Sequence, residues 1–213
     1  MTAVRAARIV AVGAVWGWHP PGAQFEAHAG NGVEALNQAL RARRALRDRR
    51  PPVADAWLYS AEALGHAAAG DRRATDKALT ASRSAAEALR TTEEPPPWPW
   101  VFSFTPEKVA ACRVTCGARL GLPAWVISDD VEALATGHAK QRALLVLDIA
   151  AGHLAAGRVD AAFALAPRAL DTGLTYRSGR IVERARAVRR TLTTASPPKV
   201  VRDFDERLHG VYL

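Results

Sequence analysis

Two nearly identical hexapeptides constrain the fold of this chain more than any other feature of its sequence. They are GHAAAG at residues 65–70 and GHLAAG at residues 152–157, which begin 87 residues apart and differ at one position. A tetratricopeptide unit has about 34 residues, so two units and one insertion account for this spacing. Between them, CGARLG at residues 116–121 ends in a glycine at the equivalent point. The spacing therefore predicts an array of helical hairpins that turn at glycines.

The composition favours helices along the whole chain. Alanine dominates, followed by leucine, arginine and glutamate, all of which favour helices, and no stretch alternates polar and apolar residues over the length of a strand. The predicted class is all-α, with residues 24–32 as a turn and Asp55 as a helix cap. The expected helices span about 33–49, 55–69, 72–90, 106–120, 123–134, 139–156, 159–172 and 178–192, with one short helical turn in the tail.

Small residues in the second helix of the hairpins support this prediction. Ala162 and Ala169 lie where the second helix of a tetratricopeptide unit needs small side chains so that two helices can approach closely. Ala78 lies in a similar place after a slip of one residue, whereas the middle unit carries the bulky Trp125. We therefore expect antiparallel helical hairpins stacked as a tetratricopeptide-like right-handed solenoid.

Proline-rich segments divide the chain into three parts. We expect a leader or extra N-terminal helix at residues 1–30, the helical repeat domain at residues 31–195, and a tail with a short helix at residues 196–213. No segment reaches the roughly 20 apolar residues that a membrane-spanning helix requires. We therefore expect a cytoplasmic protein that has no membrane partner.

The repeated histidines, His66 and His153, do not predict a metal or catalytic site. Successive units are separated by roughly 10 Å, so equivalent residues with a unit between them cannot share an ion. Each imidazole is expected to be half-buried, with one ring nitrogen hydrogen-bonded. Cys112 and Cys116 share one helix face but lack the second cysteine pair of a zinc site. We therefore expect no metal, no cofactor and no catalytic residue.

The segment PWPWVFSF at residues 97–104 concentrates aromatic side chains. Trp98, Trp100, Phe102 and Phe104 alternate, so an extended backbone places them on one side. They either plug a gap between diverging hairpins or form an aromatic wall over a ligand groove.

The concave face of such an array is formed by the first helix of each unit. Its expected residues, counted from the turn glycines, are Trp57, Ser60, Leu64, Lys108, Ala111, Thr115, Leu144, Leu147 and Leu154, and the aromatic wall would add Trp98 and Trp100. An apolar ligand or an amphipathic helix suits this face. The alternative is that these side chains pack against neighbouring helices or a second subunit, which leaves a homodimer open.

Two other functions remain open. The net charge is +8, and arginines concentrate at residues 41–50 and 177–190, so nucleic acid is a possible but not favoured partner. An enzyme would need a pocket without a recognised motif, in which Asp148 orients a histidine or tyrosine. Asp148 is therefore included among the candidate site residues.

The chain resembles the C-terminal region of actinobacterial helix-turn-helix regulators of the XRE family. The resemblance covers about residues 33–210 and is carried, in the family's order, by WPWVFSFTPEKVAACRVTCGARLGLPAW, KQRALLVLDIAAGHLAAGRVDAAFALAPRAL, TYRSGRIVERARAVRR and VRDFDERL. It implies a tetratricopeptide-like array that senses a ligand or mediates assembly, and it carries over no catalytic residue. Trp16-Gly17-Trp18 and Pro20-Pro21 argue against a preceding DNA-binding domain. We therefore expect a regulatory or adaptor module that binds a peptide, a protein or a small molecule.

Overall fold

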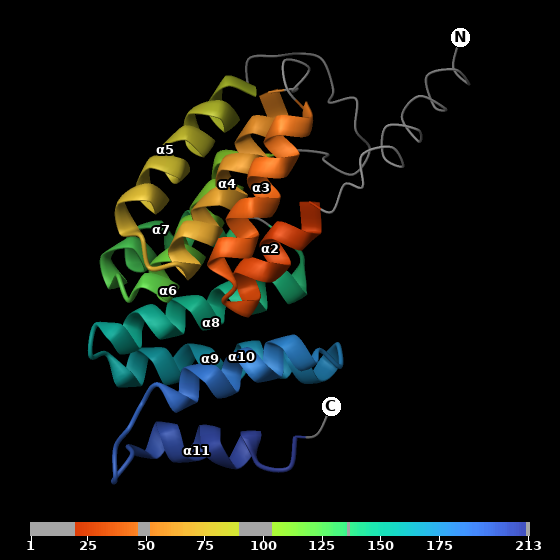
Figure 1. Ribbon diagram of the computed structural model, residues 1–213. Coiled ribbons are helices and arrows are strands. Elements are labelled where there is room, and N and C mark those ends of the chain that lie inside the picture. The colour runs from red at the N-terminus through yellow and green to blue at the C-terminus, as the bar shows by residue number, and fades with distance from the viewer. Residues whose placement is uncertain (1–19, 47–51, 90–103, 136, 212–213) are drawn as a thin grey trace. The chain divides into compact units, whose positions relative to one another are not determined.

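The computed structural model describes residues 20–46, 52–89, 104–135 and 137–211, which form ten helices and no strand (Figure 1). The all-α prediction is confirmed for this part of the chain, and the helices pack neighbour to neighbour. They are α2 (Pro20–Ala29), α3 (Gly32–Leu46), α4 (Pro52–Ala68), α5 (Arg72–Leu89), α6 (Pro106–Leu120), α7 (Pro123–Leu134), α8 (Ala139–Ala155), α9 (Val159–Thr175), α10 (Gly179–Arg190) and α11 (Lys199–Leu208).

The predicted helix bounds hold at α6 and α7, whereas two local predictions near the N-terminus are wrong. Residues 24–32 are not a turn, because α2 continues to Ala29 and only Gly30 and Asn31 separate it from α3. Asp55 does not cap a helix, because α4 already begins at Pro52 and Asp55 lies in its first turn. Proline suits the first turn of a helix, where its missing N–H has no intrahelical partner.

The chain divides into two compact units, residues 1–109 and 110–213. In the first unit, α2, α3, α4 and α5 pack in chain order, and their contacts are made mainly by small residues. Ala35, Ala56 and Ala61 are fully buried. A Cβ atom at Gly32 would lie 2.7 Å from the backbone nitrogen of Ala69, so α3 begins against the backbone of α4.

The second unit has larger side chains in its core. Helices α8 and α9 form a hairpin, α10 packs on both, and α11 packs on α9. The main apolar cluster of this unit contains Phe163, Leu147, Leu170, Ile181, Val182, Val188, Val201 and Phe204, all almost fully buried. This cluster holds together the four C-terminal helices of the chain.

The glycines that the sequence placed at equivalent points adopt the same turn conformation. Gly70, Gly121 and Gly157 have φ values of +78°, +64° and +73°, which glycine adopts more readily than other residues. After each one, the next N–H donates back to a carbonyl of the preceding helix, at His66 (2.9 Å), Gly117 (2.9 Å) and His153 (2.8 Å). This is the Schellman helix ending, so the predicted equivalence of these three turns is confirmed.

Candidate functional site

A buried polar site in the second unit centres on the carboxylate of Asp148. This residue lies on α8 and is only 6% exposed. Its Oδ1 accepts hydrogen bonds from Nε and Nη2 of Arg184 on α10, at 2.8 and 2.5 Å. Its Oδ2 accepts a hydrogen bond from Oγ1 of Thr115 on α6, at 2.8 Å. One buried carboxylate therefore joins three helices that are separated in the chain by α7 and α9.

The local sequence explains how these side chains are positioned. Pro106 starts α6 and the turn at Gly121 ends it, so Thr115 lies in the interior of the helix. In α8, Gly152 allows Val126 of α7 to approach, because a Cβ there would lie only 2.5 Å from Val126 Cγ1. This close approach sets α8 against α7 one turn after Asp148.

Further polar groups on α6 lie within electrostatic range of this carboxylate. Burial lowers the pKa of Arg119, while the nearby Asp148 favours its charged form and Arg184 opposes it. Burial raises the pKa of the Cys116 thiol well above its usual range, and the neighbouring Cys112 raises it further. Neither cysteine forms a disulfide. Because a neutral thiol is a poor nucleophile, Cys116 is poorly suited to nucleophilic catalysis.

The structure brings together two of the predicted site residues, Thr115 and Asp148. The enzyme alternative expected a histidine or tyrosine at Asp148, but its partners among the described residues are a threonine and an arginine. Leu144 and Leu154, also on α8, are half-buried and pack against the main apolar cluster of this unit. Lys108 on α6 is half-buried, and burial lowers its pKa.

Other predicted face residues lie inside the protein. Leu147 is fully buried in the second unit, and Leu64 is 5% exposed in the first. Ser60 is also buried, with its Oγ 2.9 Å from Ser82 Oγ of α5. For these three residues the structure favours the alternative, that they pack against neighbouring helices.

The remaining candidates belong to the aromatic group. Trp57 is half-buried and packs against small clusters of alanines and Leu58. Trp98 and Trp100 lie outside the described residues, so their predicted wall is not placed. Phe104, the last of the alternating aromatic residues, is buried.

Sequence reasoning missed Arg184, although a signal for it exists. The buried residues of α10 are Ile181, Val182, Ala185 and Val188. Helical spacing places Arg184 at the edge of this apolar stripe, whereas Arg180 and Arg190 are exposed. The periodicity of α10 could therefore have separated its partly buried arginines, Arg184, Arg186 and Arg189, from the exposed ones.

Many of the basic residues that suggested nucleic acid are engaged within the protein. Arg41 pairs with Glu34 at 2.7 Å, and Arg43 pairs with Glu62 at 2.8 Å. In the second cluster, Arg184, Arg186 and Arg189 pair with Asp148, Glu183 and Asp205. These pairs offset part of the positive charge that phosphate binding requires.

The histidines of the repeated hexapeptides contribute to the turns through their backbone. The carbonyls of His66 and His153 accept the helix-ending hydrogen bonds. The prediction of a hydrogen-bonded ring nitrogen is not met at Nδ1 of His153, which is buried without a partner. Within the described ranges, no three His, Cys, Asp or Glu side chains gather as a metal site would require. None of the helices described is long and apolar enough to cross a membrane.

Comparison with known proteins gives no relative from which a function could be transferred. No protein family model, curated protein or solved structure matches this chain. The function is therefore inferred from the residues of the chain itself.

Proposed function

We propose that this chain is a helical-repeat binding module of the regulatory or adaptor class. It is related to the tetratricopeptide-like region of actinobacterial XRE-family regulators and stacks its hairpins as a solenoid. Its ligand is a peptide, a protein segment or a small molecule that docks where α6, α8 and α10 meet. The sequence segments that resemble this family, together with the neighbour-to-neighbour helix packing, support the proposal.

One observation carries the location of the binding site. Arg184 uses Nε and Nη2 to hold Asp148, and no described residue accepts a hydrogen bond from its Nη1. Its side chain is 31% exposed. A guanidinium has five N–H donors, so Nη1 retains two for a ligand. The carboxylate keeps the group oriented, which reduces the entropy lost on binding.

The chemistry of this face differs from the sequence-based expectation of an apolar groove. Leu147 is buried beneath it, while the groups at or near the surface are Thr115, Arg184 and the half-buried Arg119. The Thr115 hydroxyl already donates its proton to Asp148, so the guanidinium of Arg184 is the donor offered to a ligand, and guanidinium groups bind carboxylates best. The preferred ligand therefore has at least one carboxylate or carbonyl group.

Native mass spectrometry of the full chain, purified from the organism that makes it, tests this proposal. It reports the mass of a retained ligand and the subunit number in one measurement. The matched variants are Arg184→Lys and Arg180→Lys, which make the same change one turn apart on α10. Lysine keeps the charge but loses the forked donor geometry, so ligand retention should fall in Arg184→Lys and persist in Arg180→Lys.

Circular dichroism would confirm that both variants fold before retention is compared. Equal retention in the two variants, or an unliganded wild-type chain, would contradict the proposed site.

A further inference from the structure

Two contacts define the seam between α8 and α10. Arg184 binds Asp148, and the Lys140 ammonium lies 5.5 Å from the centroid of the Tyr176 ring, just before α10. Each contact joins residues that are 36 positions apart, so α8 and α10 run in the same direction with a constant offset. Arg180 lies between the two contacts, one helical turn from Arg184. The seam therefore has three levels, marked by Lys140, Arg180 and Arg184.

Each level of the α8/α10 seam carries a cation. Lys140 and Arg180 are exposed, and neither pairs with a carboxylate in the part of the chain that the structure describes. Arg184 binds Asp148 through Nε and Nη2, which leaves the donors of Nη1. The Asp148 carboxylate lies near Arg119 as well as Arg184, so its single negative charge leaves this level positive.

The spacing of the three levels matches an extended acidic chain. Successive levels are four residues apart along the helices, which is about 6 Å at 1.5 Å per residue. Alternate residues of an extended chain are about 6.6 to 6.8 Å apart and point to the same side. A segment with a carboxylate at every second position therefore presents one carboxylate to each level of the seam.

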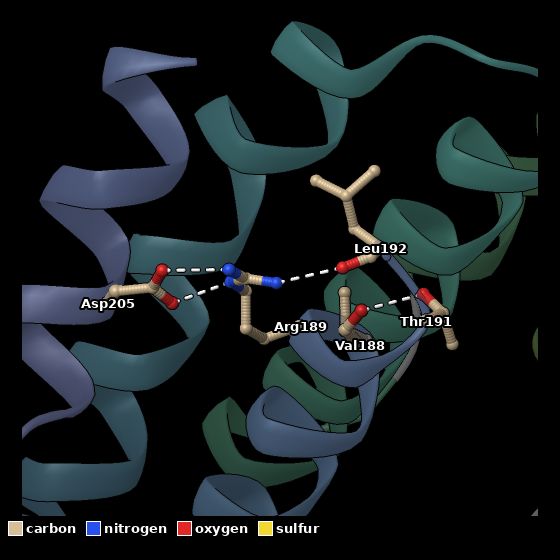
Figure 2. Close-up of polar contacts among 5 residues, drawn as sticks. All are labelled: Val188, Arg189, Thr191, Leu192 and Asp205. Atoms are coloured by element: carbon tan, nitrogen blue, oxygen red, sulfur yellow. Dashed lines mark hydrogen bonds and ion pairs between the residues drawn. The ribbon is translucent and has the colours of Figure 1, made fainter. Parts of the chain in front are cut away.

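Two other arginines of α10 are already neutralised within the chain. Nε and Nη2 of Arg189 hold the two oxygens of Asp205, at 2.6 and 2.9 Å, and Nη1 donates to the carbonyl of Leu192 at 3.0 Å (Figure 2). Arg186 pairs with Glu183, whose side chain is 59% exposed. An exposed carboxylate of α10 thus lies beside the seam, which disfavours the broad phosphate array of a nucleic acid more than a single acidic chain.

We propose that the α8/α10 seam binds an acidic segment of a partner protein, in an extended conformation, with carboxylates at alternate positions. The Nη1 donors of Arg184 hold the carboxylate at one end, and Arg180 and Lys140 supply charge for the other two. This inference rests on the function proposed above and names the chemical class of its ligand. Lysine can replace Arg180 here but not Arg184, because only Arg184 acts through its forked geometry.

Fluorescence anisotropy with the full-length chain tests this inference. The probe is a labelled, C-terminally amidated hexapeptide of alternating glutamate and alanine. The chain variants Arg180→Glu and Arg190→Glu both reverse an exposed charge of α10, but Arg190 lies beyond Arg184 on another face. We expect Arg180→Glu to weaken binding of the probe at least about tenfold. Arg190→Glu should weaken it by less than about twofold at about 0.15 M salt, which screens distant charges.

A hexapeptide with three successive glutamates followed by three alanines is the control for spacing. Only two of its carboxylates can face the seam, so it should bind about threefold to fivefold more weakly than the alternating probe. A labelled thymidine hexanucleotide is the nucleic-acid control and should bind more weakly than the alternating probe. Circular dichroism of both chain variants establishes that they are folded.

Three results would overturn this inference. They are equal binding of the alternating probe by Arg180→Glu and Arg190→Glu, equal binding of the two hexapeptides, and tighter binding of the hexanucleotide. If native mass spectrometry shows a ligand that is retained through Arg184 while the alternating probe does not bind, this inference fails and the proposed function stands. If the probe binds as expected but the native ligand is retained equally in Arg184→Lys and Arg180→Lys, the proposed function fails instead.

Discussion

The two hairpins that carry the repeated hexapeptide use their polar residues differently. In α4–α5, Ser82 Oγ donates to the carbonyl of Ala56 at 2.6 Å and lies 2.9 Å from Ser60 Oγ, so the contact closes the hairpin on itself. In α8–α9, Asp148 instead binds Thr115 and Arg184, which belong to helices outside the hairpin. The same turn sequence thus serves one hairpin whose buried polar contact is internal and one whose buried polar contact reaches neighbouring helices.

This difference shows what the hexapeptide encodes. Its last glycine and the carbonyl of its histidine form the same turn in both hairpins. The residues that decide how each hairpin is connected lie one or two turns earlier and are not repeated. Identical turns therefore specify the hairpin, and the contacts between hairpins are specified separately.

Asp148→Ala should produce the largest loss of stability, because it removes the link from α8 to both neighbouring helices. Removing one partner of a fully buried ion pair costs 3–5 kcal/mol, and the partial exposure of Arg184 reduces this to about 2–3 kcal/mol. Urea unfolding would measure the loss. Asp160→Ala, at an exposed position on α9, is the control and should change stability by less than about 0.5 kcal/mol. If Asp148→Ala and Asp160→Ala lose similar amounts of stability, the idea that Asp148 connects α8 to α6 and α10 is contradicted.

The first glycine of each hexapeptide offers a direct contrast between the two hairpins. A Cβ at position 152 would meet Val126 at 2.5 Å, whereas one at position 65 would meet the Leu36 side chain at 3.0 Å. Valine is stiff at χ1 and leucine is more adaptable, so Gly152→Ala should lose about 1–3 kcal/mol through overpacking.

Gly65→Ala should stay near wild type, because alanine also favours the helix by about 1 kcal/mol. Thermal unfolding of the two variants measures the contrast. A smaller effect at position 152 than at position 65 would show that α7 can move away from α8.

Of the three predicted losses of stability, the loss caused by removing the serine contact in α4–α5 should be the smallest. Because Ser82 donates its proton to Ala56, the bond with Ser60 must be donated by Ser60. Ser82→Ala removes both bonds and should lose about 1–2 kcal/mol. A double-mutant cycle in urea isolates the energy of the serine pair. If the losses in unfolding free energy of the two single variants add up to the loss of the double variant, the serine pair contributes nothing to closing the hairpin.

The turns and the helix class could be predicted because their causes are local. A glycine at the end of a predicted helix predicts a residue with positive φ, and an alanine-rich segment predicts a helix. An extra N-terminal helix was one of the two expectations for residues 1–30, but the extent of α2 was predicted wrongly. Its sequence, with Gly22 and several polar residues, has weak helical periodicity, and packing against α3 and α4 stabilises the helix instead.

The site could be predicted only in part. Thr115 was proposed by counting from the turn glycines, and Asp148 was proposed separately as a buried carboxylate of an unrecognised pocket. The periodicity of α10 indicates the partial burial of Arg184, but its pairing with Asp148 was missed because the partner lies 36 residues away and no local pattern records it. The burial of Ser60 was missed for the same reason, since it depends on Ser82 of the following helix.

The small-residue contacts of the first unit have a consequence for how this sequence can evolve. Gly32 lies against the backbone of α4, and Ala35, Ala56 and Ala61 are fully enclosed. These contacts are therefore made by residues that have a single methyl group or no side chain. A larger residue at Gly32 must separate α3 from α4, because the atoms it would meet are backbone atoms of α4 and its C-terminal turn. Neutral drift there is restricted to glycine, alanine and serine, whereas the leucine- and phenylalanine-rich core of the second unit can exchange one large residue for another. The two halves of the chain are therefore expected to diversify at different rates.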